Sequence, residues 1–398
     1  MKIMESSSSE RGNIFKRYPK ITISIFCILT MVVLDVTLTN AYYGLVNDEK
    51  REDADTKIRI KHAVYHHTFK ELTKETESEY SLYTNSLGFK DASLREIDLE
   101  STNHRILFIG DSFTEGVTLN YEDTFVGIID STFIDKKIEV LNAGRASYSP
   151  IIYWRKIKHL IEVDRLMFDD LVVYIDIADP HDEKKYYQLS DEMNVISRNY
   201  SQPPQPTEAE LEVMERGERI VKLKKTIKRH TTVIYTVLNF LYDASMEKPK
   251  KQKILEKETA SWSFYLSSNY VRDKWTIDDN LYESFGKDGV LIMKKYMDKL
   301  VELLKENNIK LTIAVYPYPS QVWYEDLHSR HVHVWEEWAI ENDVNFINHF
   351  PDFVVIDQDN NKKLETLKKY YIPNDVHFNK EGNKVIANKF IQTYFNKE

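Results

Sequence analysis

The chain contains one cysteine, Cys27, among its 398 residues, so no disulfide can form within it and its stability must come from packing. Basic residues are not in surplus either, because 54 Lys and Arg stand against 63 Asp and Glu, for a net charge of −9. No long basic stripe is present, which argues against nucleic acid as a partner. A fixed zinc-binding spacing is also absent, so the sequence predicts no bound metal.

The longest segment without charge lies near the amino terminus. Residues 21–34 carry no charged side chain, and Asp35 is the only one before Asp48. About 20 predominantly apolar residues suffice to cross a bilayer, so we expect a transmembrane anchor at 21–46 after a cytoplasmic tail at 1–20. Lysine and arginine flank its amino-terminal side, which favours an extracytoplasmic domain. Two alternatives stay open: a signal peptide cleaved near Thr39-Asn40-Ala41, and a buried core helix.

Strand and helix patterns alternate from residue 105 onward. The predicted strands are 106–109, 138–141, 172–175, 311–316 and 344–347, and the predicted helices include 124–131, 151–163, 290–307 and 332–341. Such alternation implies a parallel sheet covered by helices on both faces, a three-layer α/β/α domain.

This domain is expected over residues 101–398. Residues 191–286 interrupt it and predict a helical insertion, whose long helix either packs on the domain or lies on a membrane surface. Residues 47–100 are expected to form a stalk, mostly helical over 48–79, and a loop leading into the domain.

The segment Arg-Ile-Leu-Phe-Ile-Gly-Asp-Ser, residues 105–112, combines the pattern of a buried strand with a turn. Gly110 lets the backbone turn sharply after the strand, which exposes Ser112 at the edge where open α/β sheets hold ligands. A serine hydroxyl attacks only if a base takes its proton. The best candidate base is His377, with Asp375 as the group that orients the imidazole and offsets its charge.

Three separated blocks resemble the SGNH or GDSL hydrolases. They are Gly110-Asp111-Ser112-Phe113 with Gly116, the strand end Val140-Leu141-Asn142-Ala143-Gly144, and Asp375-Val376-His377. The resemblance implies a flavodoxin-like α/β/α fold and ester hydrolysis by Ser112, His377 and Asp375 without metal or organic cofactor. It also implies that the backbone amides of Ser112 and Gly144 stabilise the oxyanion of the tetrahedral intermediate.

The chain departs from this family at two positions. Where the family usually has Gly-x-Asn-Asp, whose asparagine completes the oxyanion hole, the sequence has Asp176-Ile177-Ala178-Asp179. The alanine means a slower esterase, a replacement donor such as Asn142, or a scaffold without chemistry. Asn374 stands where much of the family has its aspartate, and the resulting Asp-x-His resembles polysaccharide O-acetyltransferases of the alginate type.

Four polar residues near these blocks are weaker candidates for substrate contact: Asp111, Asn142, Asp176 and Asp179. Asp176 and Asp179 begin a carboxylate-rich turn that extends to Glu183. This turn is interpreted more simply as a solvated loop than as a calcium or substrate site. Ser112 has a plainer interpretation as a helix N-cap, and Gly144 has one in close packing. Five aromatic side chains suit either sugar stacking or the core: Tyr148, Tyr153, Trp154, Tyr318 and Trp323.

The sequence thus predicts a membrane-anchored serine esterase that removes O-acyl groups, foremost acetyl, from a glycan or small molecule through an acyl-Ser112 intermediate. Two alternatives remain: an O-acetyltransferase acting on a cell-surface polysaccharide, and a non-catalytic glycan-binding or assembly protein. We expect Ser112 Oγ to lie near an imidazole nitrogen of His377. The sequence indicates no oligomeric state.

Overall fold

The computed structural model describes residues 18–46, 58–76, 80–198, 231, 271–356, 359–373 and 375–395. The chain divides into two units, one of residues 1–52 with 202–254 and one of residues 53–201 with 255–398. Most of the predicted tail, most of the predicted insertion and Asn374 lie outside the described residues.

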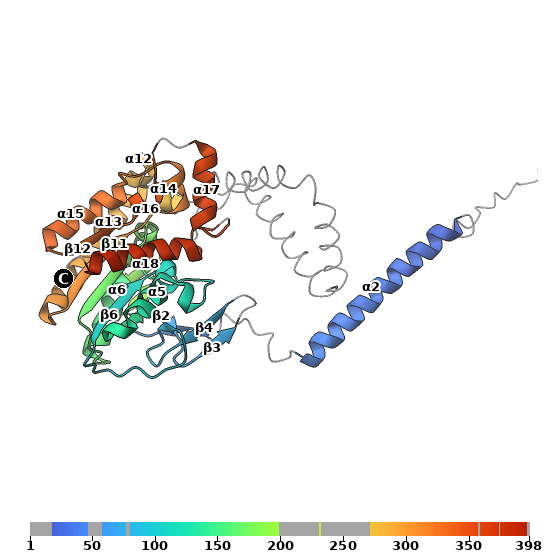
Figure 1. The fold of residues 1–398 in the computed structure, drawn as a ribbon, viewed down its shortest axis with the longest axis horizontal. Coiled ribbons are helices and arrows are strands. Elements are labelled where there is room, and N and C mark those ends of the chain that lie inside the picture. Colours follow the sequence, from blue (N-terminus) through green and yellow to red (C-terminus); the bar gives the residue numbers. More distant parts are fainter. Residues whose placement is uncertain are drawn as a thin grey trace, which may run out of the picture. The chain divides into compact units, whose positions relative to one another are not determined.

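In the first unit, helix α2 (Pro19–Val46) is the described element (Figure 1). Its first 22 residues, Pro19–Asn40, form an apolar stretch long enough to cross a membrane. Asp35, the acidic residue of this stretch, accepts a hydrogen bond from Thr39 Oγ1 of the same helix at 3.0 Å, which lowers the cost of removing the carboxylate from water. A membrane anchor and a signal sequence both satisfy these observations.

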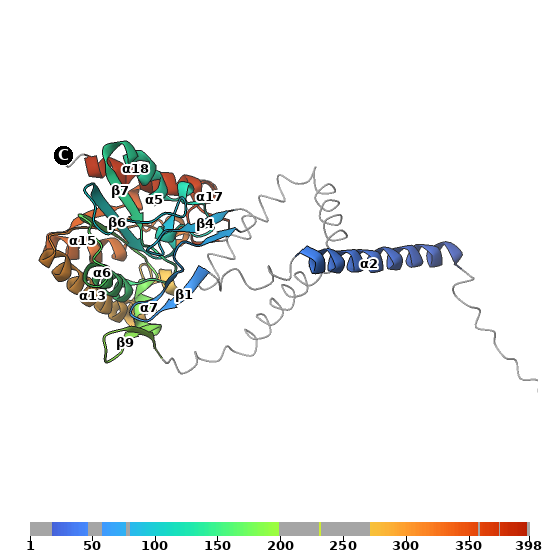
Figure 2. The same ribbon diagram turned by 90° about the horizontal axis from the view of Figure 1, so that it is seen from below.

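The second unit is built on an eight-stranded sheet in the order β12-β11-β8-β6-β7-β5-β4-β3 (Figures 1 and 2). The five strands from β12 to β7 run parallel, and the other three continue the sheet antiparallel. The parallel strands are β6 (His104–Gly110), β7 (Ile138–Asn142), β8 (Asp170–Ile175), β11 (Lys310–Val315) and β12 (Asn345–Asn348). Counted along the chain their order is 2-1-3-4-5, which is the flavodoxin-like order, so the predicted fold class is confirmed.

Helices cover both faces of the parallel strands (Figure 2). Helices α5 and α18 pack together on one face, and α6, α13 and α15 lie on the other. Trp338 of α15 donates its indole N–H to Asp298 of α13 at 2.7 Å, which joins these two helices. Their bounds are α5 (Phe125–Phe133), α6 (Pro150–Glu162), α13 (Lys287–Glu306), α15 (Arg330–Asn342) and α18 (Lys380–Phe395). The three predicted layers are therefore present.

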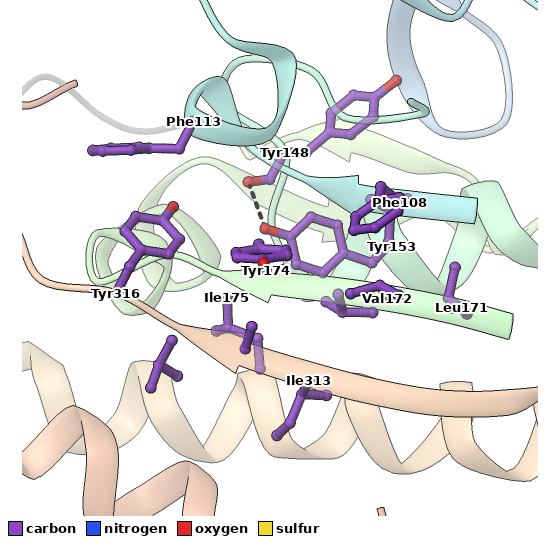
Figure 3. Close-up of a cluster of buried hydrophobic side chains, with 14 of the residues drawn as sticks. Phe108, Phe113, Tyr148, Tyr153, Leu171, Val172, Tyr174, Ile175, Ile313 and Tyr316 are labelled. Carbon is purple, nitrogen blue, oxygen red and sulfur yellow. Dashed lines mark hydrogen bonds between the residues drawn. The ribbon is translucent and has the colours of Figure 1, made fainter. Parts of the chain in front are cut away.

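The central strands β6 and β8 are covered on both faces, which explains their nearly unbroken apolar sequences. Figure 3 shows side chains from neighbouring strands gathered in one core, each at most 2% exposed: Phe108, Leu171, Val172, Ile175 and Ile313. Burial of these apolar side chains is the main source of stability, because the one cysteine of the chain cannot form a disulfide within it.

The prediction of a mostly helical segment at residues 48–79 is wrong in its described part. Strands β1 (Arg59–His62) and β2 (His66–Phe69) form an antiparallel hairpin, and β3 (Lys74–Thr76), β4 (Ser81–Thr84) and β5 (Lys90–Asp91) extend the main sheet. Ile58, Phe69 and Leu82 bury one another in a small cluster of their own. Pairing of β1 with β2 and of β3 with β4 outweighs the local pattern here, and the α/β domain begins ahead of residue 101.

Both described ends of the predicted insertion pack on the domain. Before the gap, β9 (Tyr187–Leu189) and β10 (Val195–Ser197) form an antiparallel hairpin. After it, α11 (Val271–Lys274), α12 (Asp279–Leu281) and a π-helical turn (Tyr282–Gly286) lead into α13. The buried Trp275 donates to the Ile177 carbonyl at 2.7 Å and fastens this returning segment to the loop after β8. The remaining helices are α4 (Ser112–Glu115), α7 (Asp179–Lys185), α14 (Pro319–Trp323), α16 (Phe350–Phe353) and α17 (Asn360–Tyr370), with 3₁₀ turns at Tyr121–Asp123 and Ile134–Lys136.

The strand order reverses at β6, so the connections after β6 and β8 diverge and leave a crevice beyond the carboxyl ends of these strands. Ser112 begins α4 directly after β6, and Asp176 follows β8. Gly110 permits this close turn, because a Cβ there would lie 2.2 Å from Thr114 Oγ1 and 2.8 Å from the Tyr174 carbonyl oxygen.

We expect Gly110→Ala to lower the free energy of unfolding by about 1–3 kcal/mol, because the Tyr174 carbonyl belongs to a central strand and cannot swing away. Urea unfolding followed by circular dichroism measures the loss. Ser131→Ala, on the exposed side of α5, is the control, because this small substitution creates no steric overlap. Equal stability of Gly110→Ala and the wild type would contradict the packing described for this turn.

Candidate active site

The side chains of Ser112, His377 and Asp375 form one hydrogen-bonded chain. Ser112 Oγ lies 2.8 Å from His377 Nε2, and His377 Nδ1 lies 2.6 Å from Asp375 Oδ1. When Nδ1–H donates to the carboxylate, Nε2 is the acceptor for the serine hydroxyl. Asp375 Oδ1 also accepts the backbone N–H of His377 at 3.2 Å. The predicted proximity of Ser112 and His377, 265 positions apart, is confirmed.

Aromatic packing holds the histidine loop against the turn that carries Ser112. The ring of Phe113 lies 4.8 Å from the imidazole of His377 and 5.2 Å from the ring of Phe378, centroid to centroid. Phe378 also pairs with Tyr371 across a β-bridge, which closes the loop on itself. Phe113, Phe378 and Tyr371 are all buried, so apolar burial fixes the position of the His377 imidazole.

Two opposing effects act on the pKa of His377. Burial lowers it, but the hydrogen bond and the negative charge of Asp375 outweigh burial, with help from Asp111 and Asp176, and the pKa is raised overall. For Asp375, burial acts upward, but its hydrogen bonds with His377 prevail and hold the pKa of the carboxyl below its ordinary value. The carboxylate therefore stays ionised and stabilises the imidazolium.

Asp111 contacts Ser112 from another side. Its Oδ1 accepts the Phe113 N–H at 3.0 Å as the N-cap of α4, and its Oδ2 lies 2.9 Å from Ser112 Oγ. Burial, followed by repulsion from Asp176, raises the pKa of Asp111 to about 7. An ionised Asp111 competes with His377 for the single hydroxyl proton of Ser112, whereas a protonated Asp111 donates to Ser112 Oγ and leaves that proton to His377.

Two tyrosines that follow β11 bind the buried carboxylates next to Ser112. Tyr316 OH donates to Asp176 Oδ2 at 2.6 Å and lies 3.2 Å from Asp111 Oδ1, and Tyr318 OH donates to Asp176 Oδ1 at 2.5 Å. Burial raises the pKa of Asp176, and these hydrogen bonds oppose the rise. Figure 3 shows Tyr316 beside Phe113, whose ring centroid lies 4.6 Å away. Sequence reasoning missed Tyr316, although its place at the end of a predicted strand was a usable signal.

The carboxylate-rich segment at 176–183 is not the solvated turn that the sequence favoured. Asp179 begins α7, and Asp179, Asp182 and Glu183 are at most 4% exposed because α7 packs against α6 and α13. Tyr153 OH donates to Asp179 Oδ2 at 3.0 Å, and the Ile151 N–H donates to Glu183 Oε1 at 2.6 Å. Asp176 and Asp179 thus lie buried beneath the site, at 0% and 1% exposed. Among the described residues, no group of three or more His, Cys, Asp or Glu side chains is arranged to hold a metal ion.

The N–H of Gly144, which is expected to stabilise the oxyanion, already donates a hydrogen bond within its own loop. It donates to Asn142 Oδ1 at 3.0 Å, and Asn142 Nδ2 donates to the Thr114 carbonyl at 2.7 Å. Both ends of the Asn142 amide are therefore occupied, and this buried side chain joins β7 to α4. A Cβ on Gly144 would lie 2.6 Å from Thr114 Cγ2, so the glycine serves close packing.

The backbone N–H of Ser112 stays available, since it donates no hydrogen bond within the described part of the chain. Ala178 brings no side-chain donor, and its own N–H donates to Asp176 Oδ1 at 2.7 Å. Of the two backbone donors that the resemblance implies, the N–H of Ser112 is the one without an acceptor among the described residues.

Four of the five aromatic residues considered for sugar stacking belong to the core. Tyr148, Tyr153, Trp154 and Tyr318 are buried, and Trp323 is half-buried. Tyr148 OH donates to the His67 carbonyl at 2.7 Å, which ties the loop after β7 to the β1–β2 hairpin. None of the four buried rings offers a face to a sugar.

No protein-family model and no curated protein matches the sequence. Among solved structures, the chain is similar to a GDSL-like lipase from Bacteroides thetaiotaomicron, at 12% identity over 76% of this chain and 93% of that one, with a TM-score of 0.34. It is also similar to the psychrotrophic esterase EstA from Pseudoalteromonas sp., at 11% identity over 74% and 100%, with a TM-score of 0.35. A third similar structure is the acetyl xylan esterase AlAXEase, at 12% identity over 73% and 98%, with a TM-score of 0.38. The likeness is one of fold. The GDSL type is also the one that the three sequence blocks resemble.

We expect Asp111→Asn to stabilise the protein above neutral pH. The unfolded chain loses the Asp111 proton near the ordinary pKa of 3.8, whereas the folded protein holds it to about pH 7, so wild-type stability falls as the pH rises between these values. Asparagine keeps an acceptor for the Phe113 N–H without the charge. The gain in unfolding free energy should be about 1–3 kcal/mol at pH 8 and vanish near pH 4.

Urea unfolding at pH 4 and pH 8 measures this difference. Asp135→Asn removes an exposed carboxylate and controls for the change in net charge. A gain that is the same at both pH values, or a loss at pH 8, would contradict a neutral Asp111 in the folded protein.

Proposed function

We propose that this chain is a serine hydrolase of O-acyl esters that works through an acyl-Ser112 intermediate. The observation that carries the proposal is the hydrogen-bonded chain from Ser112 through His377 to Asp375, beyond the carboxyl end of β6. A nucleophile bonded to a base, with the base oriented by a carboxylate, is the arrangement that acyl transfer requires.

The first half of the reaction forms the acyl-enzyme. His377 Nε2 takes the proton of Ser112 as Oγ attacks the ester carbonyl, and the imidazolium is stabilised by Asp375 2.6 Å away. The Ser112 N–H faces the developing oxyanion. His377 then returns the proton to the leaving alcohol, which departs as the acyl-serine ester forms. In the second half, His377 takes a proton from water, and the attack of this water on the acyl-serine releases the carboxylic acid and restores Ser112.

The substrate proposed is an O-acetyl group on a glycan. The resemblance to the family supports an ester substrate, and helix α2 supports a location at a membrane, with the catalytic domain outside the cytoplasm and acting on envelope glycans. Water is the proposed acyl acceptor. An O-acetyltransferase is the second candidate, favoured by the Asp-x-His spacing at residues 375–377. Acetate released without a glycan acceptor supports the hydrolase, and acetylated glycan with little free acetate supports the transferase.

We expect a fluorophosphonate probe to label the wild-type chain at Ser112. Ser112→Ala should abolish labelling, and His377→Ala should reduce the rate of 4-nitrophenyl acetate hydrolysis by roughly 10³-fold or more, because the hydroxyl then has no base. Ser131→Ala, at an exposed serine, should label like the wild type. Equal labelling of wild type and Ser112→Ala would remove Ser112 as nucleophile, and no labelling of either would favour a non-catalytic glycan-binding protein.

The pH dependence of kcat/KM should report His377 as the base. Because Asp375 raises its pKa, the rise of activity with pH should be centred above 6.5, where the imidazole becomes neutral. Asp375→Asn should move this midpoint to lower pH and reduce kcat by roughly 10⁴-fold through loss of the oriented tautomer. Initial rates of the wild type and of Asp375→Asn are measured between pH 5 and 9. An unchanged midpoint would show that another group is the base.

A further inference from the structure

The hydroxyl of Ser112 has one hydrogen and two neighbours that can accept it. Its Oγ lies 2.8 Å from His377 Nε2 and 2.9 Å from Asp111 Oδ2. If both neighbours are acceptors, the hydroxyl can donate to only one of them at a time. A proton on Asp111 Oδ2 turns that oxygen into a donor to Ser112 Oγ and leaves the hydroxyl hydrogen to His377. What fixes the proton on Asp111 therefore also fixes the hydrogen bond between the serine and the imidazole.

Asp111 and Asp176, here called the two acids, contact the same hydroxyl group. Tyr316 OH lies 2.6 Å from Asp176 Oδ2 and 3.2 Å from Asp111 Oδ1. Both acids are buried, at 7% and 0% exposed for Asp111 and Asp176. Two buried carboxyl groups at this separation do not both ionise readily, because each charge lacks water and the two charges repel each other. Near neutral pH the two acids therefore hold one proton between them.

The hydrogen-bond donors around the two acids are unequally divided. Tyr316 and Tyr318, here called the tyrosine pair, donate to the two oxygens of Asp176 at 2.6 and 2.5 Å. The Ala178 N–H donates to Asp176 Oδ1 as well, at 2.7 Å. Asp111 accepts one backbone N–H at 3.0 Å, as the N-cap of α4. Each donor stabilises the charged form of the carboxyl group that accepts it, so the charge belongs on Asp176 and the proton on Asp111.

Charged and titratable groups on the surrounding elements also face the two acids. They are His377 on the loop before α18, Asp179 on α7, Tyr153 on α6, and Arg272 and Asp273 on α11. Burial, followed by repulsion from the two acids, raises the pKa of Asp179 well above its ordinary range, so Asp179 adds no charge near neutral pH. Arg272 attracts and Asp273 repels the charge on Asp176, so their effects oppose each other. His377 is neutral when it acts as a base. The difference between the two acids therefore comes from their hydrogen bonds.

We propose that the tyrosine pair positions a proton for the reaction of Ser112. By holding the negative charge on Asp176, it keeps the proton on Asp111 and leaves His377 as the single acceptor for the serine hydrogen. This inference rests on the proposed function. The tyrosine hydroxyls contact no reacting atom and act through the two acids, so they are positioning groups. Activity then requires a neutral His377 and a protonated Asp111, and kcat/KM should rise and then fall as the pH increases.

Tyr318→Phe tests the tyrosine pair, because Tyr318 OH donates to Asp176 and not to Asp111. With one donor removed from Asp176, part of the proton should move there from Asp111. We expect kcat for 4-nitrophenyl acetate at pH 7 to fall about 5- to 10-fold, as for the loss of one hydrogen bond to a charged group, with KM unchanged. The alkaline fall of kcat/KM should also begin at lower pH than in the wild type.

Asp111→Asn tests the mechanism by rescue. The asparagine Nδ2 donates to Ser112 Oγ whatever the charge of Asp176, so this variant should lose the alkaline fall of activity. In this background Tyr318→Phe should change kcat by less than about 2-fold, because no proton on residue 111 remains to be displaced. A purely structural role of Tyr318 would give the same loss in both backgrounds. Equal losses with and without Asp111→Asn would therefore overturn the proposal.

Tyr174→Phe is the matched control. Tyr174 is buried, its ring centroid lies 6.2 Å from that of Tyr316 (Figure 3), and its hydroxyl lies 3.4 Å from His349 Nε2. The substitution removes a buried tyrosine hydroxyl without removing a donor from either acid, so its pH profile should match that of the wild type. Circular dichroism melting of each variant checks that the fold is kept. A loss of activity as large as that of Tyr318→Phe would overturn the proposal.

An infrared measurement separates this inference from the proposed hydrolase. A protonated carboxyl group has a C=O stretch that a carboxylate lacks, and the difference between a protein and its Asp111→Asn derivative isolates the signal of Asp111. At pH 6 we expect this signal in the wild type and a weaker one in Tyr318→Phe. Equal signals in both would overturn the inference. If 4-nitrophenyl acetate is not hydrolysed and the fluorophosphonate does not label, the proposed hydrolase fails, and the infrared difference still decides where the proton lies.

Discussion

The contact between Ser112 and His377 depends on the packing of two segments 265 positions apart. A hydrogen bond of 2.8 Å between exposed, flexible groups would contribute little, because water competes for both partners. Here Phe113, next to the serine, packs on the imidazole and on Phe378, next to the histidine. Apolar burial thus sets the distance between the serine hydroxyl and the imidazole, and the hydrogen bond follows from it.

The same region concentrates groups that cost stability. Asp111, Asp176 and Asp179 are buried close together, and each has a raised pKa because burial disfavours its charged form. Tyrosine hydroxyls offset part of this cost by donating to the carboxylates. Buried acids that raise each other's pKa are typical of functional sites. In this protein they lie beneath Ser112, and the protonation of Asp111 determines how many acceptors compete for the hydroxyl proton of Ser112.

Much of the architecture could be predicted from local sequence. The five parallel strands lie within two residues of their predicted bounds, because strands buried on both faces require continuous apolar runs. The prediction of a mostly helical segment at 48–79 failed, since short, partly exposed strands have no strong period and gain their stability from pairing, β1 with β2 and β3 with β4. Asp179 and Glu183 look like solvent-facing charges in sequence. They are buried because Tyr153 and the Ile151 amide supply donors that local sequence does not reveal.

The sequence by itself determined which residues are chemically able to act and which strands form, because side-chain chemistry and hydrophobic period are local properties. Ser112, Asp375 and His377 were identifiable on that basis, as was the apolar helix α2. Only the tertiary structure decided that the Gly144 amide is already bonded to Asn142, that Tyr316 and Tyr318 bind Asp176, and that Arg59 reaches Glu115 beside Arg145. Each of these depends on a hydrogen bond or charge pair whose partner comes from another element or a folded loop, and the order of strands in the sheet determines which elements meet.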